Sequence, residues 1–217
     1  MITVTLNKSE LKNARNVHEE RKRHNLAVGA EEQYDCPPEH SNKYAHQGVI
    51  GEVAFAKATG QYWPGYHQGE YDMLDVGDNE VRSTECQSGH LIVHPKDLDP
   101  PKESRKTGGR NRRFCLVLLS HKDGIVTAKL AGWCWGRDAE KDAYWRKDTG
   151  RPAWFVPQDH LTPAETLVSN SKRMEELDRQ VEWLRAERHA LACRHHLTYS
   201  GTEFETPPGE GWVSHAD

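Results

Sequence analysis

The spacing of hydrophobic positions changes along the chain and predicts helices first and strands afterwards. Residues 2–6 alternate and are rich in β-branched side chains, which favours a short strand. Apolar residues at helical spacing then predict a helix that is capped by Asn7 and runs to about residue 26. A second helix is predicted over residues 41–58 and ends before Gly60.

Two glycines interrupt this second predicted helix. Gly48 and Gly51 each lower its intrinsic stability, by roughly 1 kcal/mol relative to alanine. Because a glycine has no side chain, we expect both positions to allow the close approach of another part of the backbone.

Strand-like segments follow the second helix. The segments MLDV and EVRST flank Gly77, Asp78 and Asn79, which are typical turn residues, and they are predicted to pair as a hairpin. A helix followed by a run of strands predicts an α/β domain over residues 1 to about 160. The further predicted strands cover residues 90–94, 114–119, 124–133 and 153–156.

A long helix is predicted after this domain, over residues 163–192. The sequence TPAE is a helix-start signal, because Thr162 can cap the helix and Pro163 fits its first turn. Apolar residues then recur at spacings of three, four or seven, which is the pattern of a coiled-coil seam. This helix would either dock on its own domain or join two copies of the chain as a homodimer. The seam residues are Leu167, Met174, Leu177, Val181, Leu184 and Leu191.

The composition of the last residues predicts a tail, and the absence of long apolar runs indicates where the protein is located in the cell. Residues 197–217 contain four acidic residues and no Lys or Arg, so we expect a flexible acidic tail. No apolar run approaches the ~18 residues that cross a bilayer. The N-terminus has neither the basic start nor the apolar core of a secretory signal. We therefore expect a cytoplasmic protein without membrane contact.

Charge is unevenly distributed along the 217-residue chain. The formal net charge of −4 argues against a protein that coats nucleic acid through bulk charge. Residues 102–113, however, carry six positive charges and one negative charge. This segment is the best candidate for holding a phosphate backbone, with a solvated loop as the alternative. Its candidate nucleic-acid-binding residues are Arg105, Lys106, Arg110, Arg112 and Arg113.

Acidic side chains concentrate at the predicted hairpin. If residues 77–78 form a two-residue turn, Asp75 lies opposite Glu80. Side chains alternate along a strand, so Asp75, Glu80 and Arg82 are expected to share one face of the hairpin. The alternative is that the acids are only turn formers and surface strand residues.

These carboxylates suit a metal site that includes Glu52 from the second predicted helix. Carboxylate oxygens are hard ligands of the kind that Mg²⁺ and Mn²⁺ prefer. We expect Asp75 and Glu80 to bind the ion, with Asp72 competing for the place of Asp75. Such an ion lowers the pKa of bound water, and a cation such as Arg82 beside it stabilises charge on a phosphoryl oxygen.

Four segments resemble the PD-(D/E)XK nuclease superfamily, and phage-type members of it in particular: GVIGEVAFAKATG, DVGDNEVRST, LIVHPKD and GWCWGRDAEKDAYW. The resemblance covers roughly residues 44–160. It implies an αβββαβ core, in which a helix is followed by a three-stranded meander, a second helix and another strand. The expected fold class is therefore α/β, with a nuclease-like core and a long C-terminal helix.

The resemblance also implies roles for individual residues. The Glu that the family carries on its first core helix matches Glu52, and its Asp matches Asp75, with Asp72 as the competing choice. The (D/E)-X-K motif matches Glu80 and Arg82, so that an arginine stands in the place of the lysine. An arginine contacts phosphate well but keeps its proton at all ordinary pH values.

The function implied by the resemblance is Mg²⁺- or Mn²⁺-dependent hydrolysis of DNA phosphodiester bonds. Asp75 and Glu80 would bind the ion, and Glu52 would bind a second ion or position water. Arg82 would stabilise the phosphate in the transition state. The arginine in the lysine place favours an alternative, a catalytically silent nuclease-like protein that binds DNA or another protein. A phage-encoded chain of this kind would act in the host cytoplasm.

Overall fold

The computed structural model describes residues 2–29, 38–65, 74–99, 109–148, 151–168 and 179–188. The chain falls into two compact units, Met1–Ser171 and Lys172–Asp217. The first unit is a mixed α/β domain with two sheets that are mostly antiparallel. Among the described segments, every helix is too short or too polar to cross a membrane.

The larger sheet has four strands in the order β1-β5-β4-β2. Strands β4 (Arg113–Lys122) and β5 (Ile125–Trp135) form a long antiparallel hairpin, and β1 (Ile2–Leu6) pairs antiparallel with β5. Strand β2 (Asn79–Thr84) lies at the edge and pairs with β4 in parallel. Among the described residues, the other side of β2 has no strand partner beyond the bridge between Val76 and Asn79.

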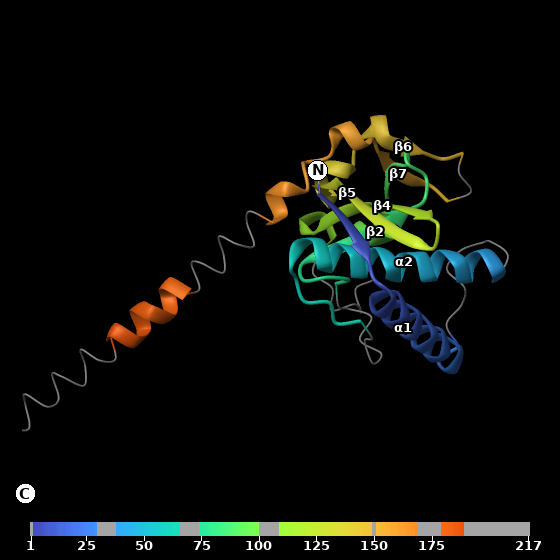
Figure 1. Cartoon of the computed structure of the whole chain (residues 1–217). Helices are drawn as coiled ribbons and strands as arrows, with labels where there is room; N and C mark the ends of the chain where they lie inside the picture. The colour runs from blue at the N-terminus through green and yellow to red at the C-terminus, as the bar shows by residue number, and fades with distance from the viewer. Residues whose placement is uncertain are drawn as a thin grey trace, which may run out of the picture. The chain divides into compact units, whose positions relative to one another are not determined.

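Two long helices cover one face of this sheet. Helix α1 (Lys8–Ala27) begins with the predicted cap, since the side chains of Asn7 and Glu10 each accept the other's backbone N–H. Figure 1 shows α2 (Pro38–Thr59) lying across the sheet, with α1 packed beyond it. The hydrophobic core between α2 and the sheet is built around Phe55, Val81, Val117, Leu119 and Leu130.

Gly51 accounts for the close approach of α2 to β2. A Cβ atom on Gly51 would lie 2.5 Å from the Cβ of Ser83, closer than two such carbons can come. Ser83 also donates its hydroxyl to the carbonyl oxygen of Gln47, which fixes the helix on the strand. At Gly48 an added Cβ would meet no atom within 4 Å. The predicted close approach is therefore confirmed at Gly51 and is wrong at Gly48.

A second, three-stranded sheet covers the opposite face. Its strands are β3 (Leu91–Val93), β7 (Ala153–Val156) and β6 (Trp145–Arg146), in that order across the sheet. A second core, which includes Leu91, Phe114, Leu116 and Val156, fills the space between the two sheets. The short helical segments are α3 (Pro95–Leu98), η1 (Gly109–Asn111), α4 (Gly136–Ala139), η2 (Asp142–Tyr144) and η3 (Gln158–His160).

The predicted hairpin at residues 73–84 forms only in part. The two-residue turn is confirmed, because Val76 and Asn79 pair across it through both backbone hydrogen bonds. The predicted pairing of Asp75 with Glu80 is wrong, since Asp75 is not in a strand and β2 takes β4 as its ladder partner instead. After β2 the chain enters the second sheet, so the match to an αβββαβ core stays a prediction.

The predicted long C-terminal helix begins inside the first unit. Residues 165–168 are helical, and Leu167 is buried in the core beneath the sheet, so this first seam residue packs on its own domain. In the second unit residues 179–188 are helical, and Val181 and Leu184 are exposed there. The other seam positions and the predicted tail lie outside the described residues. The continuous helix and the homodimer therefore stay predictions.

Candidate functional site

A cluster of charged side chains surrounds the free edge of β2. Val81 faces α2 and belongs to the first core, so the alternating Glu80 and Arg82 face the second sheet. The Arg82 guanidinium lies over the ring of Phe114, 5.7 Å from its centroid, which places it on that face. Glu52 belongs to α2 on the opposite face. Glu80 and Arg82 therefore share one face, as predicted, whereas Glu52 lies on the other face and Asp75 lies at the strand edge.

Arg82 is surrounded by three carboxylates. Its Nη2 donates to Oδ2 of Asp97 at 3.1 Å, and its Nη1 lies 3.6 Å from Oε2 of Glu80 and 3.9 Å from Oδ2 of Asp75. Burial disfavours the charge of Arg82, but the carboxylates, Asp97 first, outweigh burial and raise its pKa above the ordinary arginine value. Arg82 is thus a permanent cation, held at a fixed position by its neighbours.

Asp75 lies at the edge of β2 between the two faces. Its Oδ2 accepts the backbone N–H of Val81 at 2.7 Å, so the side chain occupies the place that a neighbouring strand would take. Burial and then the charge of Glu52 raise the pKa of Asp75 to about 6, against the opposing effects of Arg82 and of the Val81 N–H. The Asp75 carboxylate is therefore close enough to Glu52 for repulsion and to Arg82 for attraction.

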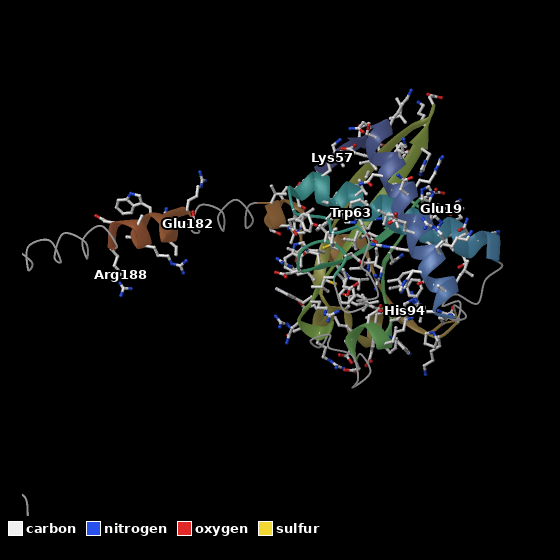
Figure 2. All side chains as sticks on the ribbon, turned by 90° about the horizontal axis from the view of Figure 1, so that it is seen from below. Glu19, Lys57, Trp63, His94, Glu182 and Arg188 are labelled. Atoms are coloured by element: carbon white, nitrogen blue, oxygen red, sulfur yellow. The ribbon has the colours of Figure 1, made fainter. Side chains whose placement is uncertain are left out.

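Glu52 is the most enclosed of the predicted site residues, with 5% of its surface exposed. Arg21 of α1 donates to both of its carboxylate oxygens, Nη1 to Oε1 at 2.7 Å and Nη2 to Oε2 at 2.8 Å. Trp63, labelled in Figure 2, donates its indole N–H to Oε2 at 2.9 Å. Arg21 in turn donates to the carbonyl oxygen of Gly65 at 2.7 Å. This carboxylate therefore accepts three hydrogen bonds from two residues.

Glu80 is paired with a second buried arginine. Arg112, which is 7% exposed, donates from Nη1 to Oε1 of Glu80 at 3.1 Å. Asp97 completes the cluster from the first turn of α3, where its Oδ2 also accepts the backbone N–H of His94 at 3.0 Å. Figure 2 labels His94 in the first unit. This helix start therefore fixes the carboxylate that orients Arg82.

Sequence reasoning missed Arg21 and Asp97. Arg21 carries no signal, because it lies 31 residues from Glu52 and only the packing of α1 on α2 brings the two together. Asp97 does carry a sequence signal. In HPKD a proline opens a helical turn, and the acid two residues later can accept the backbone N–H of the residue before the proline. That pattern predicts a capping carboxylate, although not its contact with Arg82.

The cluster contains carboxylates, which are ligands of the kind that a hard divalent cation prefers. Four carboxylates, those of Glu52, Asp75, Glu80 and Asp97, face three guanidiniums, those of Arg21, Arg82 and Arg112, which leaves one negative charge in excess. In the part of the chain that the structure describes, no three His, Cys, Asp or Glu residues converge on one point. Mg²⁺ commonly uses only one or two carboxylates and fills its shell with water and phosphate oxygens. Asp72, the competing ligand, lies outside the described residues.

The predicted nucleic-acid-binding arginines have different surroundings. Arg110 binds Asp99, with 3.0 Å between Nη2 and Oδ2, and it also binds Glu140 through Nε at 2.9 Å. Arg112 is buried against Glu80, as described above, and does not lie on an open surface. Arg113 is partly buried, with 22% of its side chain exposed, and lies over the ring of Trp135. Arg105 and Lys106 lie outside the described residues.

No family model, curated protein or solved structure matches this chain. The site is therefore defined by its own geometry, which is a partly buried group of acids and arginines around the edge of β2, with Asp75 between the two faces.

Proposed function

We propose that the chain hydrolyses DNA phosphodiester bonds with the help of Mg²⁺ or Mn²⁺. The observation that supports this proposal best is the state of Asp75, a carboxylate that the Val81 N–H holds between Glu52 and Arg82. Its pKa of about 6 reflects burial and repulsion from Glu52. Carboxylates that repel one another in a low-dielectric site gain stability when a cation binds between them.

Asp75 is the central ligand in this proposal, with Glu52 or Glu80 as the second carboxylate. A bound divalent ion would lower the pKa of its water and polarise a phosphoryl oxygen. Arg82 would donate hydrogen bonds to a non-bridging phosphate oxygen as negative charge develops there. Its raised pKa excludes a role as proton donor or acceptor, so its contribution is electrostatic. Asp97 would hold the guanidinium in the orientation needed.

A cleavage assay with Asp75→Asn tests the proposal. Asparagine keeps the shape and the oxygen that accepts the Val81 N–H but removes the charge that binds an ion. With linear, circular and branched DNA in Mg²⁺ or Mn²⁺, we expect the variant to lose on the order of 100-fold in rate, as for other residues that act on the transition state. Cleavage by Asp75→Asn at the wild-type rate would overturn the proposal.

The matched control is Asp123→Asn, in the exposed turn between β4 and β5. Asp123 has a φ of 51°, a conformation that asparagine adopts readily, so this change removes one carboxylate without strain. The control should cleave at the wild-type rate. A parallel loss in both variants would indicate that net charge, and not the site, limits the reaction.

The second candidate is a catalytically silent nuclease-like protein that binds DNA or another protein. It is favoured by the arginine contacts, because the Arg21 clamp on Glu52 and the contacts of Arg82 already supply cations to the carboxylates. Calorimetric titration with Mn²⁺ distinguishes the two candidates. Saturable heat that disappears in Asp75→Asn supports the hydrolase, whereas no heat from the wild type up to millimolar Mn²⁺ supports the silent protein.

A further inference from the structure

Two arginines lie over the ring of one tryptophan at the end of the β4–β5 hairpin. Trp135 is the last residue of β5, and it pairs with Arg113, the first residue of β4. The Cζ of Arg113 is 5.9 Å from the Trp135 ring centroid, and the Cζ of Arg137, in α4, is 5.3 Å from it. Trp133 packs edge-on against the same ring, with centroids 5.4 Å apart and planes at 85°. The ring is thereby fixed and carries two cations.

Neither guanidinium is neutralised by a close, buried carboxylate among the described residues. Arg137 donates from Nη1 to the amide oxygen of Asn111 at 3.1 Å, which is an uncharged acceptor. The carboxylate that faces Arg113 is that of Asp78, 3.8 Å away on a side chain that is 88% exposed, so water and salt screen this attraction. Arg110, by contrast, binds both Asp99 and Glu140. Among the described arginines of this region, Arg113 and Arg137 are therefore neutralised least by carboxylates.

The pair lies at the end of the sheet near the start of β2, on the face opposite to that of Glu80 and Arg82. Arg113 is in register with Asn79 across the β2–β4 ladder, and the next pair along the same ladder is Glu80 with Phe114. Neighbouring strands are separated by roughly 4.8 Å. Because consecutive residues of a strand face opposite sides of the sheet, a polyanion that contacts Arg113 would reach Glu80 only by passing around the start of β2 and β4.

We propose that Arg113, Trp135 and Arg137 form a docking platform for the phosphate backbone of DNA. Stacking on the ring restricts the guanidiniums before any ligand arrives, so less side-chain entropy is lost when they bind. The planar fork of an arginine matches two phosphate oxygens at once. The platform rests on the proposed function, because it names where the substrate of the neighbouring site is held. It assigns no role in binding to Arg110 or Arg112.

Fluorescence anisotropy with labelled single-stranded and duplex DNA tests the platform in EDTA, where cleavage does not interfere. The double variant Arg113→Ala with Arg137→Ala should bind at least tenfold more weakly than the wild type. Each arginine that neutralises a phosphate contributes about −0.9 to the slope of log K against log salt concentration, so the slope should shrink by about 2. Trp135→Leu should weaken binding severalfold, because both guanidiniums lose the surface that orients them.

Arg110→Ala is the matched control, since it removes an arginine of the same region whose charge is already paired. It should bind DNA within about twofold of the wild type, and thermal melting of every variant should show that it is folded. A double variant with the wild-type affinity and salt slope would overturn the platform. So would an Arg110→Ala variant as weak as the double variant, or a wild type that binds neither probe.

The same measurements separate this inference from the proposed function. Asp75→Asn should bind DNA in EDTA as tightly as the wild type, because it lies outside the platform. Loss of cleavage in Asp75→Asn together with normal binding by the double variant would leave the hydrolase standing and sink the platform. If the wild type cleaves no DNA but binds it through the platform residues, the platform would stand and the hydrolase would be overturned.

Discussion

The guanidinium of Arg21 binds both carboxylate oxygens of Glu52, at 2.7 and 2.8 Å. This bidentate pair joins α1 to α2 at a position where Glu52 is almost fully enclosed. Helix α1 lies outside residues 44–160, the part of the chain that resembles a nuclease core, yet it supplies the cation that makes burial of Glu52 tolerable. The first helix is thus part of the candidate site.

Removing this cation should destabilise the domain strongly. Arg21→Ala leaves the Glu52 carboxylate buried without its main counter-charge, which typically costs about 3–5 kcal/mol in the free energy of unfolding. Urea denaturation measures this loss. Lys22→Ala, on the exposed side of the same helix, should change stability by less than about 0.5 kcal/mol. Similar losses in both variants would show that the ion pair is not responsible, since alanine is the stronger helix former at both positions.

Stability should depend on pH through Asp75. Its pKa rises from 3.8 to about 6 on folding, so between these values the folded protein binds more protons than the unfolded one. Stability from this group is therefore present at low pH and is lost as pH rises through that window. Asp75→Asn cannot titrate, so its free energy of unfolding relative to wild type should increase from about pH 4 to about pH 7 and then level off.

Urea titrations at several pH values check this dependence, with Asp123→Asn as the reference. A difference between Asp75→Asn and wild type that stays constant over the whole range would contradict the assigned pKa. The expected increase in the free energy of unfolding of Asp75→Asn at neutral pH also distinguishes Asp75 from a residue whose role is structural alone.

Glu80 and Arg112 form the other buried pair, and they allow a test of charge against shape. Glu80→Ala removes the carboxylate that Arg112 contacts at 3.1 Å and should cost about 3–5 kcal/mol. Glu80→Gln keeps an acceptor oxygen and should cost clearly less. Chemical denaturation of the two variants provides the comparison, and equal losses would show that the negative charge itself is required.

The two glycines of α2 provide a packing test with opposite expected signs. Gly51→Ala places a methyl group 2.5 Å from the Cβ of Ser83 and should destabilise the domain by about 1–3 kcal/mol, because helix and strand must separate. Gly48→Ala meets no atom within 4 Å and should stabilise it by up to about 1 kcal/mol. Differential scanning calorimetry would show the two melting temperatures moving in opposite directions. Two shifts of the same sign would contradict the assigned contact.

Local patterns predicted much of the secondary structure. The cap at Asn7 and the helix after it are confirmed, and so are strands at 114–119, 124–133 and 153–156, because each depends on side chains near one another in sequence. Strand pairing was less predictable. Nothing in the segment EVRST indicates that β2 would join β4 in parallel, since that choice depends on how α2 packs across the sheet.

The candidate site was predictable to a similar extent. Asp75 lies near Glu52 and Arg82, and Glu80 lies near Arg82, but Asp75 was predicted on the same hairpin face as Glu80 and Arg82, whereas it lies at the edge of β2. The partners Arg21 and Asp97 were missed, because a buried charge selects its counter-charge from whatever element folds against it. Leu167 fits the coiled-coil spacing as well as the other seam residues do, yet it packs into the core of its own domain.

The contact between Asp75 and the Val81 N–H has a consequence for solubility. A free strand edge offers backbone donors to any extended chain that meets it and is a common starting point for aggregation. The Asp75 carboxylate occupies one of these donors on β2 and adds a negative charge that repels a second edge of the same kind. A change that removes both the acceptor and the charge, such as Asp75→Val, would thus expose the edge of β2 on an otherwise folded molecule. Self-association would then grow with protein concentration.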